Sequence, residues 1–276
     1  MDKKIKILLF VLLFVGIFIL LYPLVSQYWN SKVQSKAIVD YKELLEKIEN
    51  IDYTDMFNEG DSYNKKLSKL DFPLTQYKML KNYNKLFNIN NDGMIGYISI
   101  DKINVKLPIY HGTRSSVLNS AVGHLEGTSL PIGGESTHSV LSAHRGLPTS
   151  KLFTNLNKLE IGDTFEITVI DRKYTYQVDK ITIVEPSDIT NIKIDANKDY
   201  VTLMTCTPYG LNTHRLLVRG IRIDNVKEDQ LIIVSDAYKI DKLIVSLLIA
   251  LPILLFFTIY VLFKPAKRKV DKKEEE

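Results

Sequence analysis

The chain has 276 residues, 45% of them hydrophobic and 25% charged, as expected of a folded domain that carries membrane-spanning segments. Its formal net charge is +4, but without the nine basic and five acidic residues at its two ends 27 residues of each sign are left. The central part is therefore neutral, which argues against a nucleic-acid-binding protein, since such proteins carry a basic excess. The single cysteine excludes an internal disulfide.

Two apolar stretches, residues 5–25 and 243–263, are each long enough to cross a membrane as a helix. A cleaved signal peptide is the alternative for the first stretch. Its apolar run is longer than such peptides use, however, and no small-residue cleavage site follows it. Tyr28 and Trp29 instead resemble an aromatic anchor at a membrane surface. Pro252 can kink the second stretch without preventing its insertion.

The charges beside these spans predict their orientation. Lysines occur in the short tail 1–4 and at the start of the first span, and basic residues are frequent in the charged tail 264–276. Positively charged flanks stay in the cytoplasm. We therefore predict that both ends are cytoplasmic and that the intervening segment lies on the extracellular face of the cell membrane.

Residues 26–93 are predicted to form a helical appendage. Apolar residues recur every three or four positions after the first span, which predicts an amphipathic helix with one buried stripe. They are Trp29, Val33, Ala37, Tyr41, Leu44, Leu45 and Ile48. Residues 51–93 are polar, with a weak helical pattern and little core material. The Asn90–Gly93 run predicts a turn and a domain boundary.

From Met94 onward the pattern changes to short strands. Eight segments rich in β-branched and aromatic residues, without regular helices between them, predict a mainly β domain over residues 94–240. Such a domain is either a sandwich or a closed barrel. The predicted strands are 96–100, 105–110, 139–143, 164–170, 174–184, 201–205, 215–223 and 231–234.

Cys206 ends one of these apolar runs, directly before a turn with Pro and Gly. A thiol at a strand end can be opened to a substrate by the following loop, whereas the alternative for a lone cysteine is a small buried hydrophobic residue. A nucleophilic cysteine needs a base or a cationic partner, because a free thiol is mostly protonated near neutral pH. His144 also follows a strand and precedes a turn, so the two side chains can meet at one rim.

Arg215 opens the strand after Cys206. If the two strands pair through a turn at residues 207–214, the guanidinium returns to the side of the sulfur, where it can donate to a developing oxyanion. His214 and Arg219 are competing donors. Because strand residues alternate, Arg219 shares the face of Arg215 further along the strand, and we predict a structural or ion-pairing role for it.

No metal or cofactor is predicted. The competing hypothesis is a zinc site made by His111 and His124 with His138 or His144, but their spacings include none of the close pairs typical of such sites. Glu126 and Asp163 are predicted to be solvated surface carboxylates.

Four sequence blocks resemble one enzyme family. They are Thr202–Cys206 (TLMTC), Leu141–Pro148 (LSAHRGLP), Leu107–Thr113 (LPIYHGT) and His124–Pro131 (HLEGTSLP). In this order and spacing, over about residues 94–225, the chain resembles the class C sortases, the pilus-assembling sortases of Gram-positive bacteria.

The resemblance implies a closed eight-stranded sortase-type β-barrel in which Cys206 is the nucleophile, His144 the general acid/base and Arg215 the donor that orients oxyanion or substrate. It implies a membrane-anchored cysteine transpeptidase with pilin or surface-protein substrates that end in an LPxTG-like sorting signal. The enzyme would cleave after Thr through a thioacyl intermediate, which a pilin lysine amine would resolve. The resemblance implies no cofactor.

Class C sortases usually carry an N-terminal lid with an Asp-Pro-aromatic motif. Here residues 70–73 read LDFP, with the aromatic residue before the proline. We predict that residues 51–93 still form a lid, with Asp71 near the arginine and Phe72 over the cysteine. The alternative is a plain connecting loop.

Two other functions remain open at this point. A sortase that attaches proteins to the peptidoglycan cross-bridge differs only in the amine that resolves the intermediate. A non-catalytic surface scaffold would use its barrel to display loops, and an inert Cys206 thiol would identify it.

Overall fold

The computed structural model describes residues 3–47 and 52–225, with a few positions between 250 and 260. The chain divides into two compact units, one made of Met1–Pro23 with Asp229–Glu276 and the other of Leu24–Glu228. The predicted strand 231–234 and most of the predicted span 243–263 lie outside the described residues.

Helix α1 (Lys3–Lys47) is continuous and contains Pro23. Within the described part of the chain, one helix, Ile7–Lys47, is long and apolar enough to cross a membrane. It includes most of the first predicted span. The second span remains a prediction.

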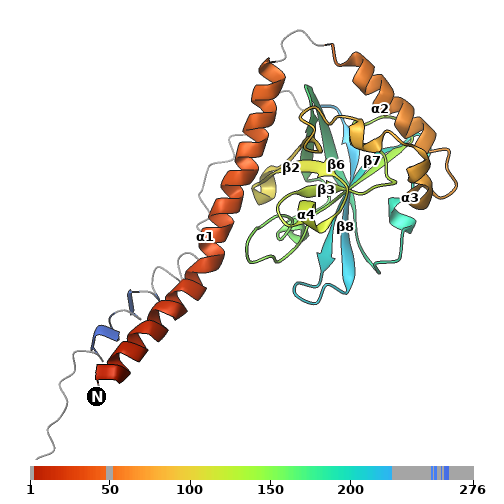
Figure 1. Ribbon diagram of the computed structural model, residues 1–276. Coiled ribbons are helices and arrows are strands. Elements are labelled where there is room, and N and C mark those ends of the chain that lie inside the picture. Colours follow the sequence, from red (N-terminus) through yellow and green to blue (C-terminus); the bar gives the residue numbers. More distant parts are fainter. Residues whose placement is uncertain are drawn as a thin grey trace, which may run out of the picture. The chain divides into compact units, whose positions relative to one another are not determined.

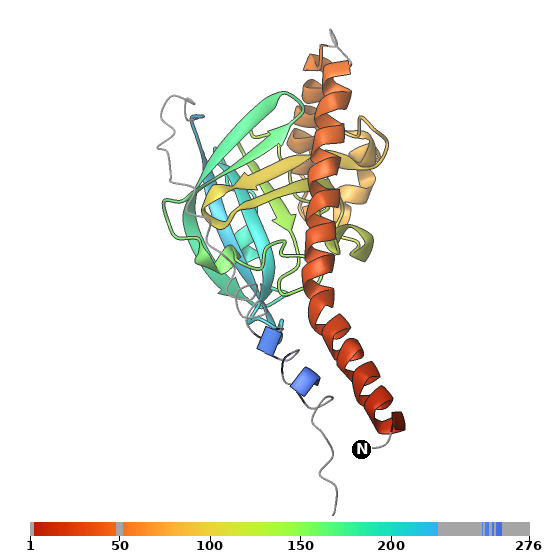
Figure 2. The same cartoon turned by 90° about the vertical axis from the view of Figure 1, so that its left-hand side faces the viewer.

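The barrel-facing side of α1 differs from the predicted apolar stripe. Gln34, Ile38 and Tyr41 are buried, whereas Trp29 is 69% and Val33 49% exposed. Figure 2 shows the part of α1 that belongs to the larger unit running along one side of the barrel. The apolar pattern was misleading because the first turns on the barrel-facing side carry amide side chains that bond to backbone carbonyls.

Tyr41 does belong to the buried face, as predicted. Its hydroxyl donates to the carbonyl of Ile95 at 3.0 Å and accepts from the backbone N–H of Ile170 at 3.0 Å. One side chain of α1 thereby pairs a backbone group of β1 (Met94–Ile100) and one directly after β5 (Thr164–Val169). With Ile38 and Met94 it forms a small apolar cluster between the helix and the barrel.

Within residues 94–223, eight strands close into a barrel in the order β1-β2-β3-β4-β7-β8-β6-β5 (Figure 1). The β2–β3 and β4–β7 pairs are parallel and the other pairs antiparallel. The strands are β1 (Met94–Ile100), β2 (Val105–His111), β3 (Val122–His124), β4 (Thr137–Ser142), β5 (Thr164–Val169), β6 (Arg172–Val184), β7 (Asp199–Thr207) and β8 (His214–Ile223).

The closed barrel decides between the two predicted β architectures. The seven predicted strands that lie within the described residues are confirmed. The sequence pattern missed β3, because three residues with a central glycine are too short to show alternation. Short helices occupy the connections: α4 (Ser115–Leu118), η3 (Asp101–Ile103), η4 (Leu156–Lys158) and η5 (Thr190–Ile192).

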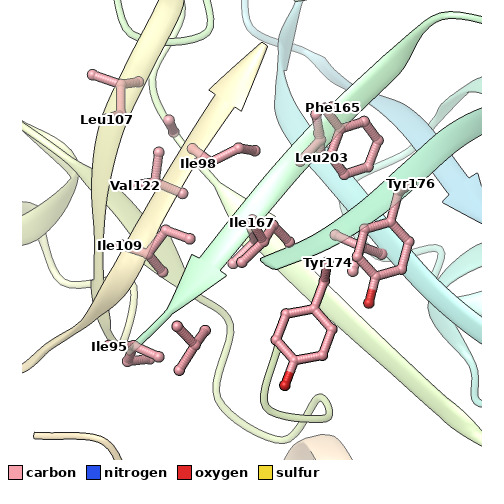
Figure 3. Packing of buried hydrophobic residues seen from close by; sticks show 14 of the residues in the cluster. Ile95, Ile98, Leu107, Ile109, Val122, Phe165, Ile167, Tyr174, Tyr176 and Leu203 are labelled. Carbon is pink, nitrogen blue, oxygen red and sulfur yellow. The ribbon is translucent and has the colours of Figure 1, made fainter. Parts of the chain in front are cut away.

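Inward-pointing side chains fill the barrel (Figure 3). In β1, Ile98 and Ile100 are fully buried while Tyr97 and Ser99 are partly exposed, as alternation in a strand requires. Phe165 and Tyr176 stack with ring centroids 5.6 Å apart. The same alternation places every second residue of β7 and β8 on the outer face, where the functional side chains lie.

Residues 52–93 contribute to this core, contrary to the prediction of an appendage with little core material. The segment forms α2 (Thr54–Leu67), α3 (Pro73–Gln76), η1 (Tyr77–Met79) and η2 (Tyr83–Lys85). Phe57, Tyr63, Leu67, Tyr83 and Phe87 are buried in the main apolar cluster. The composition was misleading because a helix buries only one stripe and can be polar elsewhere.

The predicted turn before the barrel is confirmed. Asn91 and Gly93 have φ values of 56° and 88°, and β1 begins at the next residue. Asn and Gly tolerate this left-handed conformation better than other residues.

Candidate active site

Cys206 and Arg215 are partners in the antiparallel register of β7 and β8. Side chains of paired residues point to the same face of a sheet. Leu203 and Thr205 are buried on the inner side, so alternation places the partly exposed Cys206 on the outer face, together with Met204. The predicted return of Arg215 to the cysteine along the chain is therefore confirmed at the level of strand pairing.

His144 follows β4, which runs parallel to β7 with Ser142 opposite Met204. The pairing continues beyond the strand, since the N–H of Ala143 donates to the carbonyl of Met204 at 3.2 Å. His144 and Cys206 are each two residues beyond the Ser142–Met204 pair. Parallel pairing thus places both residues at the same end of neighbouring strands.

The loop after His144 is folded against the loop after Cys206. Arg145 donates from Nη1 to Oγ1 of Thr207 at 3.0 Å. Gly146 has φ +77°, and a Cβ there would lie 2.7 Å from the ring of Tyr209. The two loops therefore contact each other at a position where only a hydrogen fits.

A pocket of about 260 Å³ lies beside Arg215 on this outer face. Met204, Leu217 and Leu74 supply apolar lining from β7, β8 and α3. The other lining residues come from two connections and the end of β6: Leu125, Glu126, Val184, Glu185, Pro186, Asp188, Ile189 and Ile192. The pocket thus combines aliphatic surface with one cation and several carboxylates.

Two of the carboxylates have defined contacts. Glu126 accepts a long hydrogen bond of 3.4 Å from the hydroxyl of Thr113. The hydroxyl and backbone N–H of Thr190 donate to Asp188 and lower the pKa of its carboxyl. Glu126 was predicted to be an ordinary surface carboxylate, whereas it lines the pocket. Asp163 does lie in a surface ion pair, with its carboxylate 2.8 Å from Nζ of Lys102.

The predicted lid residues, Asp71 and Phe72, lie directly before α3. The side chain of Phe72 is 68% exposed and Asp71 is also exposed. Leu74 is the residue of this segment that lines the pocket with Arg215. The sequence-based prediction did not include Leu74, although an aliphatic residue directly after a helix-starting proline was a usable signal.

The start of α3 lies close to the connection that follows β3. A Cβ on Gly127, which has φ +83°, would come within 2.5 Å of Cα of Leu74 and 2.8 Å of the carbonyl oxygen of Pro73. The glycine therefore allows the backbone of α3 to approach the rim of the pocket.

Arg219 has the structural role that the sequence predicts. Its Nη2 lies 2.6 Å from Oδ2 of Asp179, and the guanidinium is 4.0 Å from the ring centroid of Tyr200. The carboxylate beside it raises the pKa of Arg219. This arginine is occupied by an ion pair away from the cysteine.

His124 is a buried structural residue. Its Nδ1 lies 2.8 Å from the hydroxyl of Tyr83 and its Nε2 2.8 Å from the carbonyl oxygen of Ser129. Burial in this apolar surrounding lowers the pKa of His124 to about 3. Its imidazole is therefore neutral at physiological pH.

His111 and His138 are held in a similar way. Nδ1 of His111 lies 3.0 Å from the carbonyl oxygen of Gly93, and Nδ1 of His138 lies 2.7 Å from that of Lys193. Burial lowers the pKa of both residues. In the described ranges no group of three His, Cys, Asp or Glu side chains is arranged to hold a metal ion.

Comparison with known proteins agrees with this geometry. The family model described as the sortase domain matches residues 98–237, about half of the chain, and the match contains Cys206, His144 and Arg215. The chain belongs to the sortase family. This is a family of cysteine transpeptidases, so the hypothesis of a non-catalytic scaffold is disfavoured.

Solved structures similar to this sortase include class C enzymes, as the sequence resemblance predicted. Sortase C1 from Streptococcus agalactiae has a TM-score of 0.66 and 50% identity, and the match covers 69% of this chain and 100% of that one. Sortase C from Streptococcus pneumoniae has a TM-score of 0.63 and 38% identity, with coverage of 70% and 98%.

A curated sequence relative is matched over a shorter length. Sortase D from Bacillus subtilis (strain 168) is 32% identical over 131 residues, which cover 46% of this sortase and 63% of that protein. The chain therefore matches less than two thirds of the length of this relative.

Proposed function

We propose that this sortase is a membrane-anchored cysteine transpeptidase that cleaves an LPxTG-like sorting signal after Thr and joins it to a lysine amine of a pilin subunit. The observation that carries the proposal is the Cys206–Arg215 cross-strand pair, with His144 at the same end of the neighbouring strand. A nucleophile, an acid/base and a cationic donor at one rim are the requirements for acyl transfer through a thioester.

In the first half-reaction, Cys206 transfers its proton to His144 and its sulfur attacks the carbonyl carbon of the signal's Thr. Arg215 donates to the oxygen that becomes negative in the tetrahedral intermediate. The bond from Thr to Gly then breaks. His144 gives its proton to the leaving amine, and the Thr carbonyl remains bound to the sulfur as a thioester.

In the second half-reaction, the neutral ε-amine of a lysine attacks the thioester carbonyl. The new carbon–nitrogen bond is an isopeptide bond, and the carbon–sulfur bond breaks. The proton lost by the amine passes through His144 to the sulfur, so Cys206 is regenerated. No oxidant, metal or cofactor enters this balance.

The pocket beside Arg215 supports a substrate with an apolar segment next to the reacting carbonyl. Met204, Leu217 and Leu74 form aliphatic lining of the kind that a Leu-Pro pair can occupy. Leu74 belongs to α3, and we propose that α3 shifts when a substrate fills the pocket fully. We therefore retain the lid proposal, with Leu74 as the residue that lines the closed pocket.

A membrane location suits this reaction, because tethered substrates and a tethered enzyme meet at a high effective concentration. The apolar part of α1 is the anchor that we propose, with both ends of the chain cytoplasmic and the barrel on the extracellular face. The span 243–263 would provide the second anchor.

The proposal is tested by intact-mass analysis of the full chain in detergent micelles after incubation with an LPxTG-type peptide. We expect an adduct with the mass of the peptide truncated after Thr, absent in Cys206→Ala. Lysine-containing pilin peptides and cross-bridge amines, added separately, then identify the acceptor. Failure of a small thiol reagent to label Cys206, together with the absence of an adduct, would contradict the catalytic role.

A further inference from the structure

Three amide side chains on α1 face the barrel from consecutive turns of the helix. Gln27, Asn30 and Gln34 are spaced by three and four residues, so they lie on one helix face. Gln34 is 8% exposed, and the other two are partly buried. We refer to these three residues as the amide row.

Every member of the amide row donates to one short loop segment, residues 148–150. Nε2 of Gln27 donates to the carbonyl of Pro148 at 3.1 Å, and Nδ2 of Asn30 donates to that of Thr149 at 2.8 Å. Nε2 of Gln34 lies 3.0 Å from Oγ of Ser150 and 2.7 Å from the carbonyl oxygen of Ser120. All of these contacts lie within the unit Leu24–Glu228.

This segment is the far end of the loop that begins at His144. At its base the loop is closed by a hydrogen bond of 3.1 Å from the N–H of Phe153 to the carbonyl of His144. Leu147 and Ser150 form a bridge across it. The loop is therefore held by its own backbone at one end and by the amide row at the other.

Other residues of α1 also attach the helix to the barrel. Ile38 and Tyr41 already bury apolar surface there, and Tyr41 adds two hydrogen bonds. On the same stretch of helix Trp29 and Val33 are largely exposed. Amides occupy the inward positions where apolar residues were expected, and they supply donors to backbone carbonyls that apolar side chains cannot pair.

We propose that Gln27, Asn30 and Gln34 are positioning residues for His144. By fixing the tip of the loop 144–153 they hold the imidazole at the end of β4 beside Cys206. They contact neither the nucleophile nor the pocket, so they act through the loop. This inference rests on the proposed function, because it assigns to the amide row a role in the proton transfer of that reaction.

The helix that carries the amide row is also the helix that carries the candidate membrane span. The support for the histidine loop and the proposed membrane anchor are thus parts of one continuous element. An N-terminal truncation through residue 34 would therefore remove the proposed anchor and also the amide donors to the active-site loop.

The test uses isosteric variants of the full chain in detergent micelles. Asn30→Asp and Gln27→Glu keep the size of each side chain but replace the amide donor with an acceptor that repels the loop carbonyl. Gln177→Glu is the matched control, because Gln177 likewise donates its amide to a backbone carbonyl, that of Gly162, at 3.1 Å. Asn30→Gln keeps an amide donor at this position, so it should retain most of the activity that Asn30→Asp loses.

Two LPxT substrates separate positioning of the histidine from general damage. In the natural amide, His144 must protonate the leaving amine, whereas a thioester in place of the scissile amide releases a thiolate that needs no proton. We expect Asn30→Asp to lower kcat for the amide about tenfold, with KM within about twofold. The loss for the thioester should be smaller, because His144 then only has to accept the proton of Cys206 and has no leaving amine to protonate. An equal loss on both substrates, or a loss no greater than that of Gln177→Glu, overturns the inference.

Hydrogen exchange provides a measurement that does not depend on activity. We expect Asn30→Asp to speed exchange at the N–H groups of Gly146 and Phe153, which donate to Thr154 and His144 respectively. The strands β7 and β8 should stay protected. Unchanged exchange in the loop contradicts the inference. If exchange in the loop is faster in Asn30→Asp but the wild-type protein forms no thioacyl adduct, the amide row does hold the loop. The proposed function is then contradicted.

Discussion

Cys206 and Arg215 face each other across the β7–β8 ladder, in the last pair but one before the connecting loop. The guanidinium is held at this rim, because Nη1 of Arg215 donates to the carbonyls of His214 at 3.1 Å and Asn212 at 3.3 Å. Strand pairing fixes the backbone of both residues, and local bonds restrict the arginine. A preorganised donor of this kind stabilises charge without reorganising during the reaction.

We therefore expect Arg215→Ala to lower kcat/KM for the sorting peptide by about 10²–10³-fold. The melting temperature should change little, because the side chain is not part of the core. Steady-state kinetics and thermal unfolding of the full chain in detergent provide the measurement. Arg219→Ala is the comparison, and it should lower the melting temperature by breaking the 2.6 Å ion pair with Asp179 while sparing activity. If Arg219→Ala loses activity and Arg215→Ala loses only stability, the roles given to the two arginines are wrong.

His144→Ala should lower the rate of Cys206 acylation by about 10²–10⁴-fold, because proton transfer to the leaving amine is lost. His214→Ala is the matched control. His214 is exposed and lies next to Arg215, where its Nδ1 contacts the hydroxyl of Thr213 at 2.9 Å. We expect near wild-type acylation in this variant, measured as thioacyl adduct against time. Retained acylation in His144→Ala would remove that residue from the mechanism.

The lid proposal predicts that Leu74→Ala speeds both turnover and labelling of Cys206 by a small thiol reagent several-fold, because the open form becomes more populated. Alanine at both Asp71 and Phe72 tests whether these residues also close the site. If the double variant leaves labelling and turnover unchanged, they have no lid role. If Leu74→Ala also leaves thiol labelling and turnover unchanged, residues 51–93 are a plain connecting segment and not a lid.

A second route to an open lid is Gly127→Ala. The new methyl group would overlap the backbone of Leu74 and Pro73, so α3 must move away from the pocket. Gly162→Ala is the control, since Gly162 also has a positive φ, of 97°, but a Cβ added there would meet nothing within 4 Å. Both substitutions should lower the free energy of unfolding by about 1 kcal/mol, because they place a side chain at a positive φ. Only Gly127→Ala should speed thiol labelling, and equal labelling in the two variants would contradict the idea.

Stability should fall in acid because of the buried histidines. His124 has a folded-state pKa of about 3 against an ordinary value of 6.5. Between these values the unfolded chain binds a proton that the folded protein does not, so this contribution is complete above pH 6.5. It is lost as the pH falls, by up to about 1.4 kcal/mol per pH unit.

Unfolding free energies between pH 7 and pH 4 measure this slope, and His124→Gln should reduce it by about one proton relative to wild type. The slope is the readout, because the substitution also lowers stability at every pH by disturbing the bonds to Tyr83 and Ser129. An unchanged slope would mean that His124 is protonated in the folded state.

Sequence patterns were sufficient to predict the barrel strands, except β3, and the short-range part of the candidate site. Alternation marked each longer strand because one face of it is buried. The turn after Cys206 is short, so pairing of its flanking strands returns Arg215 to the cysteine. The same alternation placed Arg219 on that face but further along the ladder, consistent with its ion pair.

The features that depend on distant contacts became visible only in the folded molecule. The meeting of the β4 and β7 ends, 62 residues apart at the bond from Thr205 to Ala143, follows from barrel closure and leaves no local pattern. The same holds for Leu74 in the pocket and for the amide row on α1. Periodicity identifies residues that avoid water, whereas Gln27, Asn30 and Gln34 face inward because two loops far along the chain offer them backbone carbonyls.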